Sequence, residues 1–511
     1  MKRLLILIIF LLSGCTIFEP IEESNIKEKE SLKYEIESIR YSKTFEQIDP
    51  FINKVEEKDD FIKLSIGLGV TDYKNIDVQK IEKEGSIVKV FISGEKEEYS
   101  TMLSYPNLIL NIYTQDFKPN ETTFLLDNSN ISIYPIKYSL SQVASLLETN
   151  LNLTTKNMPI GKLKKEGDNF YWVIDYKGIV DRQDENLSLI DLNAKLDALT
   201  GEVIESSKKK VSEKLDFGKI ISFKEGDYIY YKKINISKEK PEIKNTEIMK
   251  FSIKNNKVSK IYETTGDIID FSVNNSGEVA FIEEINELNN LYIILPDSNK
   301  PYKAMFSIIK KPDYIKWIND NLLYIMDIDV NDIHLFEYDV LTSTDVLKAT
   351  LKTTIKGIIP GEKNILIDGV SGSNNSNIYS TVDFNNVEKL ATGHSPIILG
   401  NKLVFSFYND VEKSNGLYLL DIGNNETTTI DKEVLSVNKV NDNKILYTKK
   451  EGKESDLGVY VFDIQSKEKK YLTNVITKDV YYDSINKELY KNIFFTLNET
   501  GRDIIYKLDI Q

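Results

Sequence analysis

The sequence predicts a mainly β protein, with a C-terminal seven-bladed β-propeller preceded by two small β-rich or α+β domains and a lipidated N-terminal tether. The main observation is a short aliphatic and aromatic run, often closed by an acidic residue, that recurs seven times. Its copies end at residues 252, 295, 339, 383, 421, 463 and 509, which lie 38 to 46 residues apart. A repeat of about 40–45 residues is typical of propeller blades, four-stranded units that bury their faces only against neighbouring blades.

Each copy of the run is expected to be the third strand of a blade. A second apolar strand precedes each copy, at residues 228–234, 278–283, 322–326, 364–367, 403–407, 445–448 and 493–496. The recurrent acid is expected to accept hydrogen bonds from backbone amides of the following turn, at Asp339, Asp421, Asp463 and Asp509. No fourth strand follows the last copy before Gln511, so we expect residues 208–215 to complete the last blade and close the ring.

The N-terminus has the order of a secretory signal, with Lys2 and Arg3 followed by an apolar run over residues 4–12. That run is too short to span a bilayer, which takes about 20 apolar residues. It ends in Leu12-Ser13-Gly14-Cys15, and Cys15 is the only cysteine of the chain. The stretch resembles the bacterial lipobox, which implies cleavage of residues 1–14 and a diacylglycerol on Cys15. The alternative is a cleaved signal with an unmodified cysteine.

This resemblance implies a cell-membrane protein, held by the lipid on its extracytoplasmic face. Two or three acyl chains anchor a protein stably, where a single chain does not. Lipidation of Cys15 leaves no thiol for a disulfide, so the fold must be stabilised by a large core.

Residues 15–58 are expected to form the tether, because their first part is dense in Glu and Lys and poor in apolar residues. A helix is expected between residues 32 and 47. The whole chain has 65 basic and 79 acidic residues and a net charge of −14. An acidic protein repels phosphate backbones, so we expect no nucleic-acid partner.

Residues 59–135 are expected to form a small β-rich domain. Alternating apolar and polar residues predict strands at residues 61–68, 76–81 and 87–92, with a turn at Gly85. The order of strand, Gly-containing turn, strand and Ser104-Tyr105-Pro106 resembles the C-terminal domain of protease-complex accessory lipoproteins. An ordinary β-sandwich fragment is the alternative.

Residues 136–206 are expected to form an α+β domain. Ser139 and Gln142 make a capping box that begins a helix, and strands are expected at residues 170–176 and 189–196. The closing motif, residues 197–203, reads Asp-Ala-Leu-Thr-Gly-Glu-Val, and Gly201 should take a positive φ in its turn. Helix, Trp172-bearing strand and this motif resemble a PepSY domain, which implies a non-catalytic role in controlling extracytoplasmic peptidases or wall proteins.

Residues 207–511 are expected to form the propeller. The segments 271–281 and 315–321 resemble the strand–turn–strand of TolB-like and WD40-like blades. This resemblance predicts the architecture and leaves the function open, because propellers host many functions.

The sequence offers few residues for catalysis, and we expect no enzyme and no cofactor. The chain has two histidines, and Ser395 beside His394 should point to the opposite face of a strand. No Gly-x-Ser-x-Gly motif is present. A weak calcium-like pattern occurs at Asp327, Asp329, Asn331 and Asp332, but it lacks the expected glycine and glutamate, so no metal site is predicted.

Three functions remain open at this point. The first is a non-enzymatic lipoprotein that binds another extracytoplasmic protein through its propeller. The second is a regulator or inhibitor of a secreted peptidase, acting through residues 59–206. The third is a carbohydrate-active enzyme with paired carboxylates in the propeller funnel.

Overall fold

The computed structural model describes residues 29–96, 102–114, 122–153, 155, 157, 159–236, 244–296, 298, 300–329, 332–351, 354–361, 364–370, 376–451, 457–484, 491–499 and 501–510. The expected signal peptide, Cys15 and the start of the expected tether lie outside these residues. Two compact units divide the chain. One contains residues up to 143 with 162–172 and 196–202, and the other contains 144–161, 173–195 and 203–511. Within the described residues, no helix has the length and apolar character needed to cross a bilayer.

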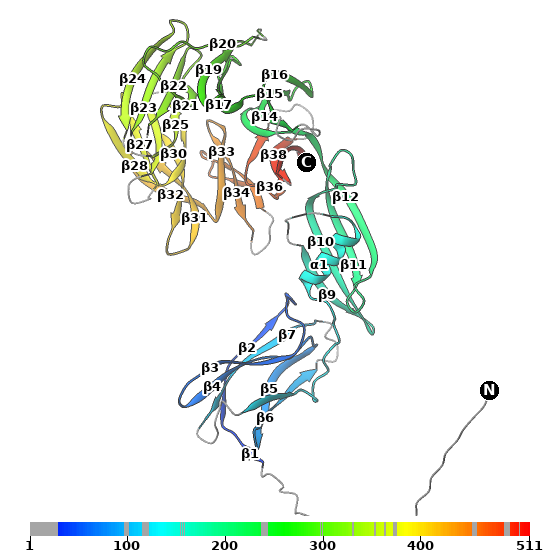
Figure 1. Cartoon of the computed structure of the whole chain (residues 1–511). Helices are drawn as coiled ribbons and strands as arrows, with labels where there is room; N and C mark the ends of the chain where they lie inside the picture. Colours follow the sequence, from blue (N-terminus) through cyan, green and yellow to red (C-terminus); the bar gives the residue numbers. More distant parts are fainter. Residues whose placement is uncertain are drawn as a thin grey trace, which may run out of the picture. The chain divides into compact units, whose positions relative to one another are not determined.

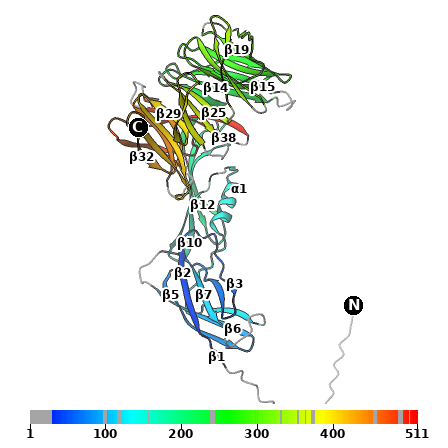
Figure 2. The same cartoon turned by 90° about the vertical axis from the view of Figure 1, so that its left-hand side faces the viewer.

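The first unit contains two four-stranded sheets (Figure 2). One has the order β1 (Glu30–Ser31), β5 (Tyr73–Glu84), β6 (Ile87–Lys96) and β8 (Thr123–Asp127). The other has the order β2 (Tyr34–Ser42), β7 (Tyr105–Tyr113), β4 (Phe61–Gly67) and β3 (Phe51–Glu57). Alternate residues of both sheets, such as Leu64 and Val90, join one buried cluster, as expected for two sheets packed face to face.

The expectation of a tether up to residue 58 is wrong for its second half. Residues 34–42 and 51–57 are strands β2 and β3, and the helix expected between residues 32 and 47 is absent. Leu32, Tyr34, Ile36 and Ile39 pack on the core of the first unit, and this burial outweighs the charge of the intervening residues.

The helix α1 (Leu140–Asn150) begins where the capping box predicts. The Ser139 amide donates to Gln142 Oε1 at 2.9 Å, and the Gln142 amide donates to Ser139 Oγ at 3.3 Å. The strands β9 (Ile160–Glu166), β10 (Asn169–Val180), β11 (Leu189–Asp197) and β12 (Val203–Phe217) follow. Gly201 has a φ of +76° in the turn before β12, as predicted.

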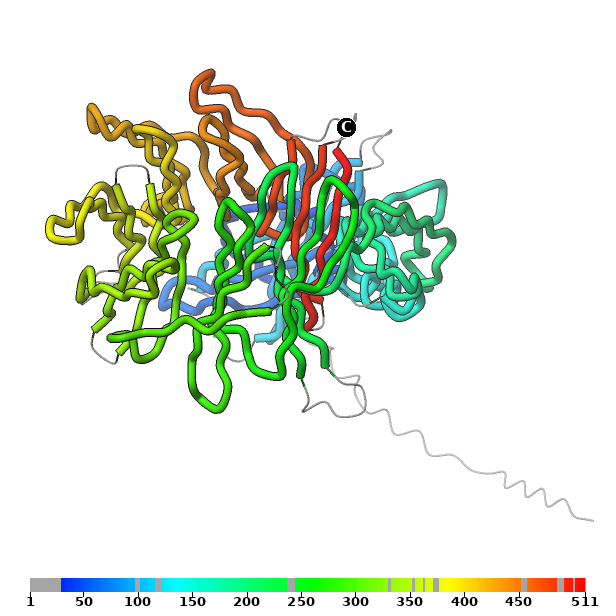
Figure 3. The backbone as a smooth tube through the Cα atoms, turned by 90° about the horizontal axis from the view of Figure 1, so that it is seen from above, coloured from blue at the N-terminus to red at the C-terminus, as the bar shows by residue number. Residues whose placement is uncertain are grey.

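The propeller consists of seven four-stranded antiparallel blades (Figure 3). From the inner to the outer strand, the first blade contains β13 (Lys219–Lys224), β14 (Tyr228–Ile236), β15 (Lys244–Ser252) and β16 (Lys257–Thr264). The second contains β17 (Asp267–Val273), β18 (Val279–Ile285), β19 (Leu288–Ile294) and β20 (Tyr302–Lys303). The third contains β21 (Pro312–Trp317), β22 (Leu322–Ile328), β23 (Ile333–Asp339) and β24 (Thr344–Leu351).

The next three blades have the same order. The fourth contains β25 (Thr354–Pro360), β26 (Ile365–Val370), β27 (Ser376–Thr381) and β28 (Val387–Thr392). The fifth contains β29 (His394–Leu399), β30 (Lys402–Asn409), β31 (Ser414–Asp421) and β32 (Glu426–Lys432). The sixth contains β33 (Val434–Asn441), β34 (Lys444–Lys450), β35 (Leu457–Asp463) and β36 (Lys469–Val475). The seventh contains β37 (Val480–Asp483), β38 (Lys491–Glu499), β39 (Arg502–Ile510) and β12.

All seven copies of the recurrent run fall on or directly after a third strand, and the apolar segments before them fall on second strands. The second strands are apolar almost throughout because both of their faces are buried between blades. In β22, for example, Leu323 and Ile325 pack with the second blade, whereas Tyr324 and Met326 pack with the fourth.

The ring closes as predicted from residues 208–215. Strand β12 pairs with β39, with Glu213 opposite Lys507 and Phe217 opposite Ile504. A buried cluster joins the first blade to the last, and Figure 3 shows these blades, in green and red, side by side. Strand β12 (Figure 1) is also hydrogen-bonded to β11 along its other edge. The seventh blade therefore belongs to a seven-stranded sheet of order β37-β38-β39-β12-β11-β10-β9.

Polar clasps reinforce two junctions between blades. Asp216 on β12 accepts from Tyr231 Oη at 2.5 Å and from Lys233 Nζ at 3.0 Å, both on β14 of the first blade. Asp431 on β32 accepts from Tyr447 Oη at 2.7 Å and from Lys449 Nζ at 3.0 Å on β34. An outer-strand aspartate thus binds a Tyr-x-Lys pair on the second strand of the next blade.

Candidate binding surfaces

Three of the four recurrent acids hold turns, as predicted. The Leu341 and Thr342 amides donate to Asp339 Oδ1, both at 2.9 Å. Asp463 accepts in the same way from Gln465 and Ser466, and Asp421 accepts from the Gly423 amide. Asp509 differs, because its carboxylate pairs with Lys507 Nζ at 3.3 Å.

The weak calcium pattern forms part of a turn. Asp327 is buried, and its Oδ2 accepts the amides of Lys310 and Lys311 at 3.0 and 3.2 Å. The Asp329 amide donates to the Asp332 carbonyl at 2.9 Å, while Asn331 lies outside the described residues. In the described part of the chain, no three His, Cys, Asp or Glu side chains are grouped to hold a metal ion.

The expectation that His394 and Ser395 point apart is wrong. Ser395 has a φ of +54°, and this left-handed conformation at an irregularity in β29 brings its Oγ to 3.0 Å from His394 Nδ1. The Ser395 amide donates to the buried Asp368 at 2.8 Å. Burial lowers the pKa of His394 despite the nearby charge of Asp368, so the imidazole is neutral at pH 7. The Asp368 carboxylate bonds the Ser395 backbone, so the cluster is not ordered as a catalytic triad.

Exposed apolar side chains gather in the hairpins between second and third strands. These hairpins all lie on one face of the ring, because each blade runs from inner to outer strand in the same sense. We call this face the hairpin face. The exposed large apolar residues in or beside the described parts of these hairpins are Ile234, Ile236, Ile285, Leu288, Ile328, Tyr408 and Val411, which come from four blades.

Val411 and Leu288 are the most prominent of these residues, with 92% and 67% of their surface exposed. On the opposite face, the turns between third and fourth strands expose Leu295, Leu341 and Val382 among the described large apolar residues, at 41%, 75% and 69%, so that face has fewer such residues but equally exposed ones. The hairpin face was not predicted from the sequence, although a signal exists: Leu288 and Val411 lie beside turn residues, where polar side chains are usual.

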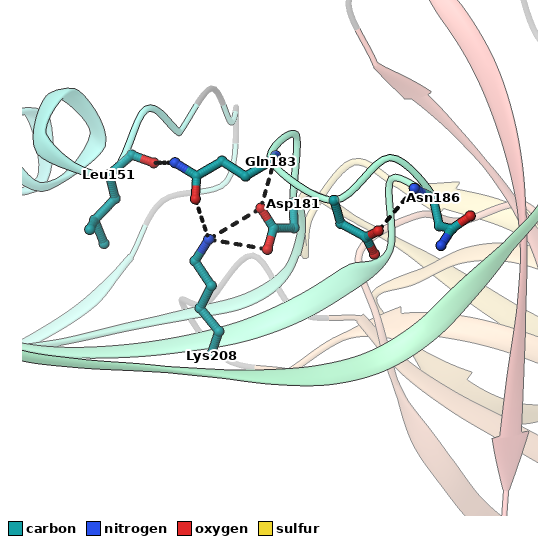
Figure 4. Close-up of polar contacts among 6 residues, drawn as sticks. Leu151, Asp181, Gln183, Asn186 and Lys208 are labelled. Carbon is teal, nitrogen blue, oxygen red and sulfur yellow. Dashed lines mark hydrogen bonds and ion pairs between the residues drawn. The ribbon is translucent and has the colours of Figure 1, made fainter.

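A loop between β10 and β11 makes polar contacts with strands β12 and β38 of the seventh blade. Lys208 Nζ on β12 bonds both Asp181 oxygens, at 3.1 and 3.2 Å, and Gln183 Oε1 at 3.1 Å (Figure 4). Gln183 donates in turn to the Leu151 carbonyl. On the blade side, Arg182 pairs with Glu499 at 2.6 Å.

A groove of about 300 Å³ lies in the second unit, beside the outer strand of the sixth blade. Its floor consists of five neighbouring strands of the seven-stranded sheet, and its wall is β36. The floor residues are Lys177, Gly178, Leu189, Asp191, Val211, Ser212, Leu508 and Phe495, and the wall residues are Tyr471, Thr473, Asn474, Val475 and Ile476.

The groove combines an apolar floor with one charge pair. Lys177 Nζ lies 3.1 Å from Asp191 Oδ2, so these charges already compensate each other. At one end Ile476 covers Gly178, whose φ is +58°; a Cβ added to this glycine would lie 3.3 Å from the Ile476 side chain. This groove could not be predicted from the sequence, because its residues come from six different strands.

Comparisons with known proteins found only distant structural similarities. No protein-family profile matches the chain, and no curated protein matches it. Among solved structures, the chain is similar to an oligogalacturonate lyase in complex with manganese, at 11% identity and a TM-score of 0.45, covering 63% of this chain and 96% of the lyase.

Two further structures are the β-propeller domain of the Trilobed protease from Pyrococcus furiosus and TolB from Acinetobacter baumannii. The protease domain has 15% identity and a TM-score of 0.43, covering 59% of this chain and 98% of that domain. TolB has 11% identity and a TM-score of 0.36, covering 70% of this chain and 88% of TolB. These distant similarities concern the propeller fold, which enzymes and non-enzymes share.

Proposed function

We propose that this chain is a non-enzymatic, lipid-anchored protein that binds another extracytoplasmic protein through the hairpin face of its propeller. The exposed apolar residues of that face, spread over four blades, are the observation that carries the proposal. The lipobox-like sequence ending in Cys15 supports the location.

The energetics favour a protein partner for this face. Burying a Leu or Val side chain contributes about 1.5–3 kcal/mol, so covering Leu288 and Val411 alone would contribute several kcal/mol.

Site-specific photocrosslinking tests the proposal. A photoreactive residue is placed at Leu288 or Val411, and in matched controls at Leu341 or Val382 on the opposite face. We expect a discrete protein adduct in intact cells from the first pair and none from the second. Equal labelling from both faces, or no protein adduct from the hairpin face, would refute binding through this face.

The anchor has a separate test. In a Cys15→Ser variant the thiol that would receive the lipid is absent, so we expect the protein to leave the membrane fraction. Membrane retention of this variant would show that something other than a lipid on Cys15 holds the protein.

A further inference from the structure

We propose that the outer edge of β36, with the groove beside it, binds an extended peptide segment of a partner protein as a fifth strand of the sixth blade. This surface is separate from the hairpin face, so either proposal can fail without the other.

The outer edge of β36 offers a place for a further strand. Among the described strands, β36 is the outermost of its sheet and pairs with β35 alone. Its outward backbone amides and carbonyls therefore form a template for another strand. Extended peptides bind such edges through main-chain hydrogen bonds, and pockets for alternate side chains supply the specificity.

The seven-stranded sheet that forms the floor of the groove distinguishes β36 from the outer strands of the first five blades. The groove brings β36 together with five strands of the seven-stranded sheet, and that sheet continues past the seventh blade through β11 and β10. At the end of β36, Ile476 lies against Gly178 on β10. A strand added to β36 would therefore have this extension of the sheet beside it, instead of standing free in solvent.

The chemistry of the groove specifies the occupant. Val211, Leu508 and Phe495 make its floor apolar, which suits apolar side chains at every second position of a strand. Lys177 and Asp191 compensate each other, so a charged side chain pointing at the floor would find no free partner.

Net charge favours a different protein over a second copy of this chain. Each copy carries a charge of −14, so two copies repel each other, whereas basic residues on the solvent side of a bound strand are attracted. The volume of about 300 Å³ is at the lower end for ligand pockets and fits a few side chains of a strand.

A peptide-binding experiment on the full chain in detergent tests the proposal. The probe is a fluorescent peptide of seven residues, the length of β36, with alternating valine and threonine and a lysine at each end. A second probe carries N-methyl groups on alternate amides and cannot pair with a strand edge. We expect the first probe to bind and the second to bind at least about tenfold more weakly.

Two variants and a second readout complete the test. Val211→Arg fills the groove and should weaken binding at least about tenfold, whereas Val387→Arg, at an exposed valine on the outer strand β28, should not change it. In hydrogen exchange, the amides of residues 473–475 should be protected by the first probe alone. Equal binding of both probes, or no binding of the first probe, would overturn the proposal. So would a wild-type homodimer that Val211→Arg dissociates, because a second copy of the chain would then occupy the groove.

Discussion

Replacing Asp431 with asparagine removes the charge at the centre of the clasp between the fifth and sixth blades. Asp431 accepts from Lys469 at 2.8 Å as well as from Tyr447 and Lys449, and its side chain is 10% exposed. Burial alone would raise the pKa of Asp431, but the hydrogen bonds from Lys469, Tyr447 and Lys449 outweigh it and lower the pKa to about 2.

The magnitude follows from this shift. A change from 3.8 to about 2, at 1.36 kcal/mol per unit, corresponds to about 2.5 kcal/mol of stability at neutral pH. Because the pKa is lower in the folded state, this stabilisation is complete above the unfolded pKa and is lost as the pH falls through the folded pKa. At pH 3, about half of it remains.

Urea unfolding followed by circular dichroism measures the effect. We expect Asp431→Asn to be about 2–3 kcal/mol less stable than the wild type at pH 7, and this difference to shrink by about half at pH 3. Asp410→Asn, at an exposed carboxylate of the β30–β31 hairpin, is the matched control and should change stability by less than about 0.5 kcal/mol. A difference that is the same at both pH values would refute the electrostatic reasoning.

Three further predictions use the same measurement. Asp216→Asn should cost about 2 kcal/mol and speed amide exchange in β13 and β39, because it weakens the clasp that closes the ring; unchanged exchange there would contradict this. Burial raises the pKa of Asp270 to about 6, so its charged form opposes folding as the pH rises through that value. Asp270→Asn should therefore stabilise the protein by about 1–3 kcal/mol at pH 7 and by almost nothing at pH 4; equal effects at both would be evidence against it. Gly201→Val should cost about 1–3 kcal/mol because of the positive φ, in contrast to Gly357→Ala, where space is open.

The blade repeat could be predicted from the sequence because each second strand is buried on both faces and each third strand ends in a fixed turn. Leu323 and Tyr324 illustrate the first constraint, and Asp339 illustrates the second. The capping box at Ser139 is likewise local, so its geometry follows from neighbouring residues alone.

Features that depend on distant residues or on local irregularity escaped prediction. Charge density suggested a tether over residues 15–58, but the apolar residues of its second half pack in a core that only the folded unit supplies. Strand alternation placed Ser395 away from His394, and a single left-handed residue reverses that. The groove beside β36 needs both a sheet extension and a blade edge, which no single stretch encodes.

The shared strand β12 sets an order of events during synthesis of the protein. Ser212 bonds the carbonyl of Lys507, a residue 295 positions later. Strand β12 is synthesised before any complete blade exists. Its partner β39 is synthesised nearly three hundred residues later, so the edge of β12 that pairs with β39 stays unpaired until then. Contacts of such separation make folding slow. The nascent chain thus carries an unpaired β edge throughout elongation, and such an edge promotes aggregation with other unfolded chains.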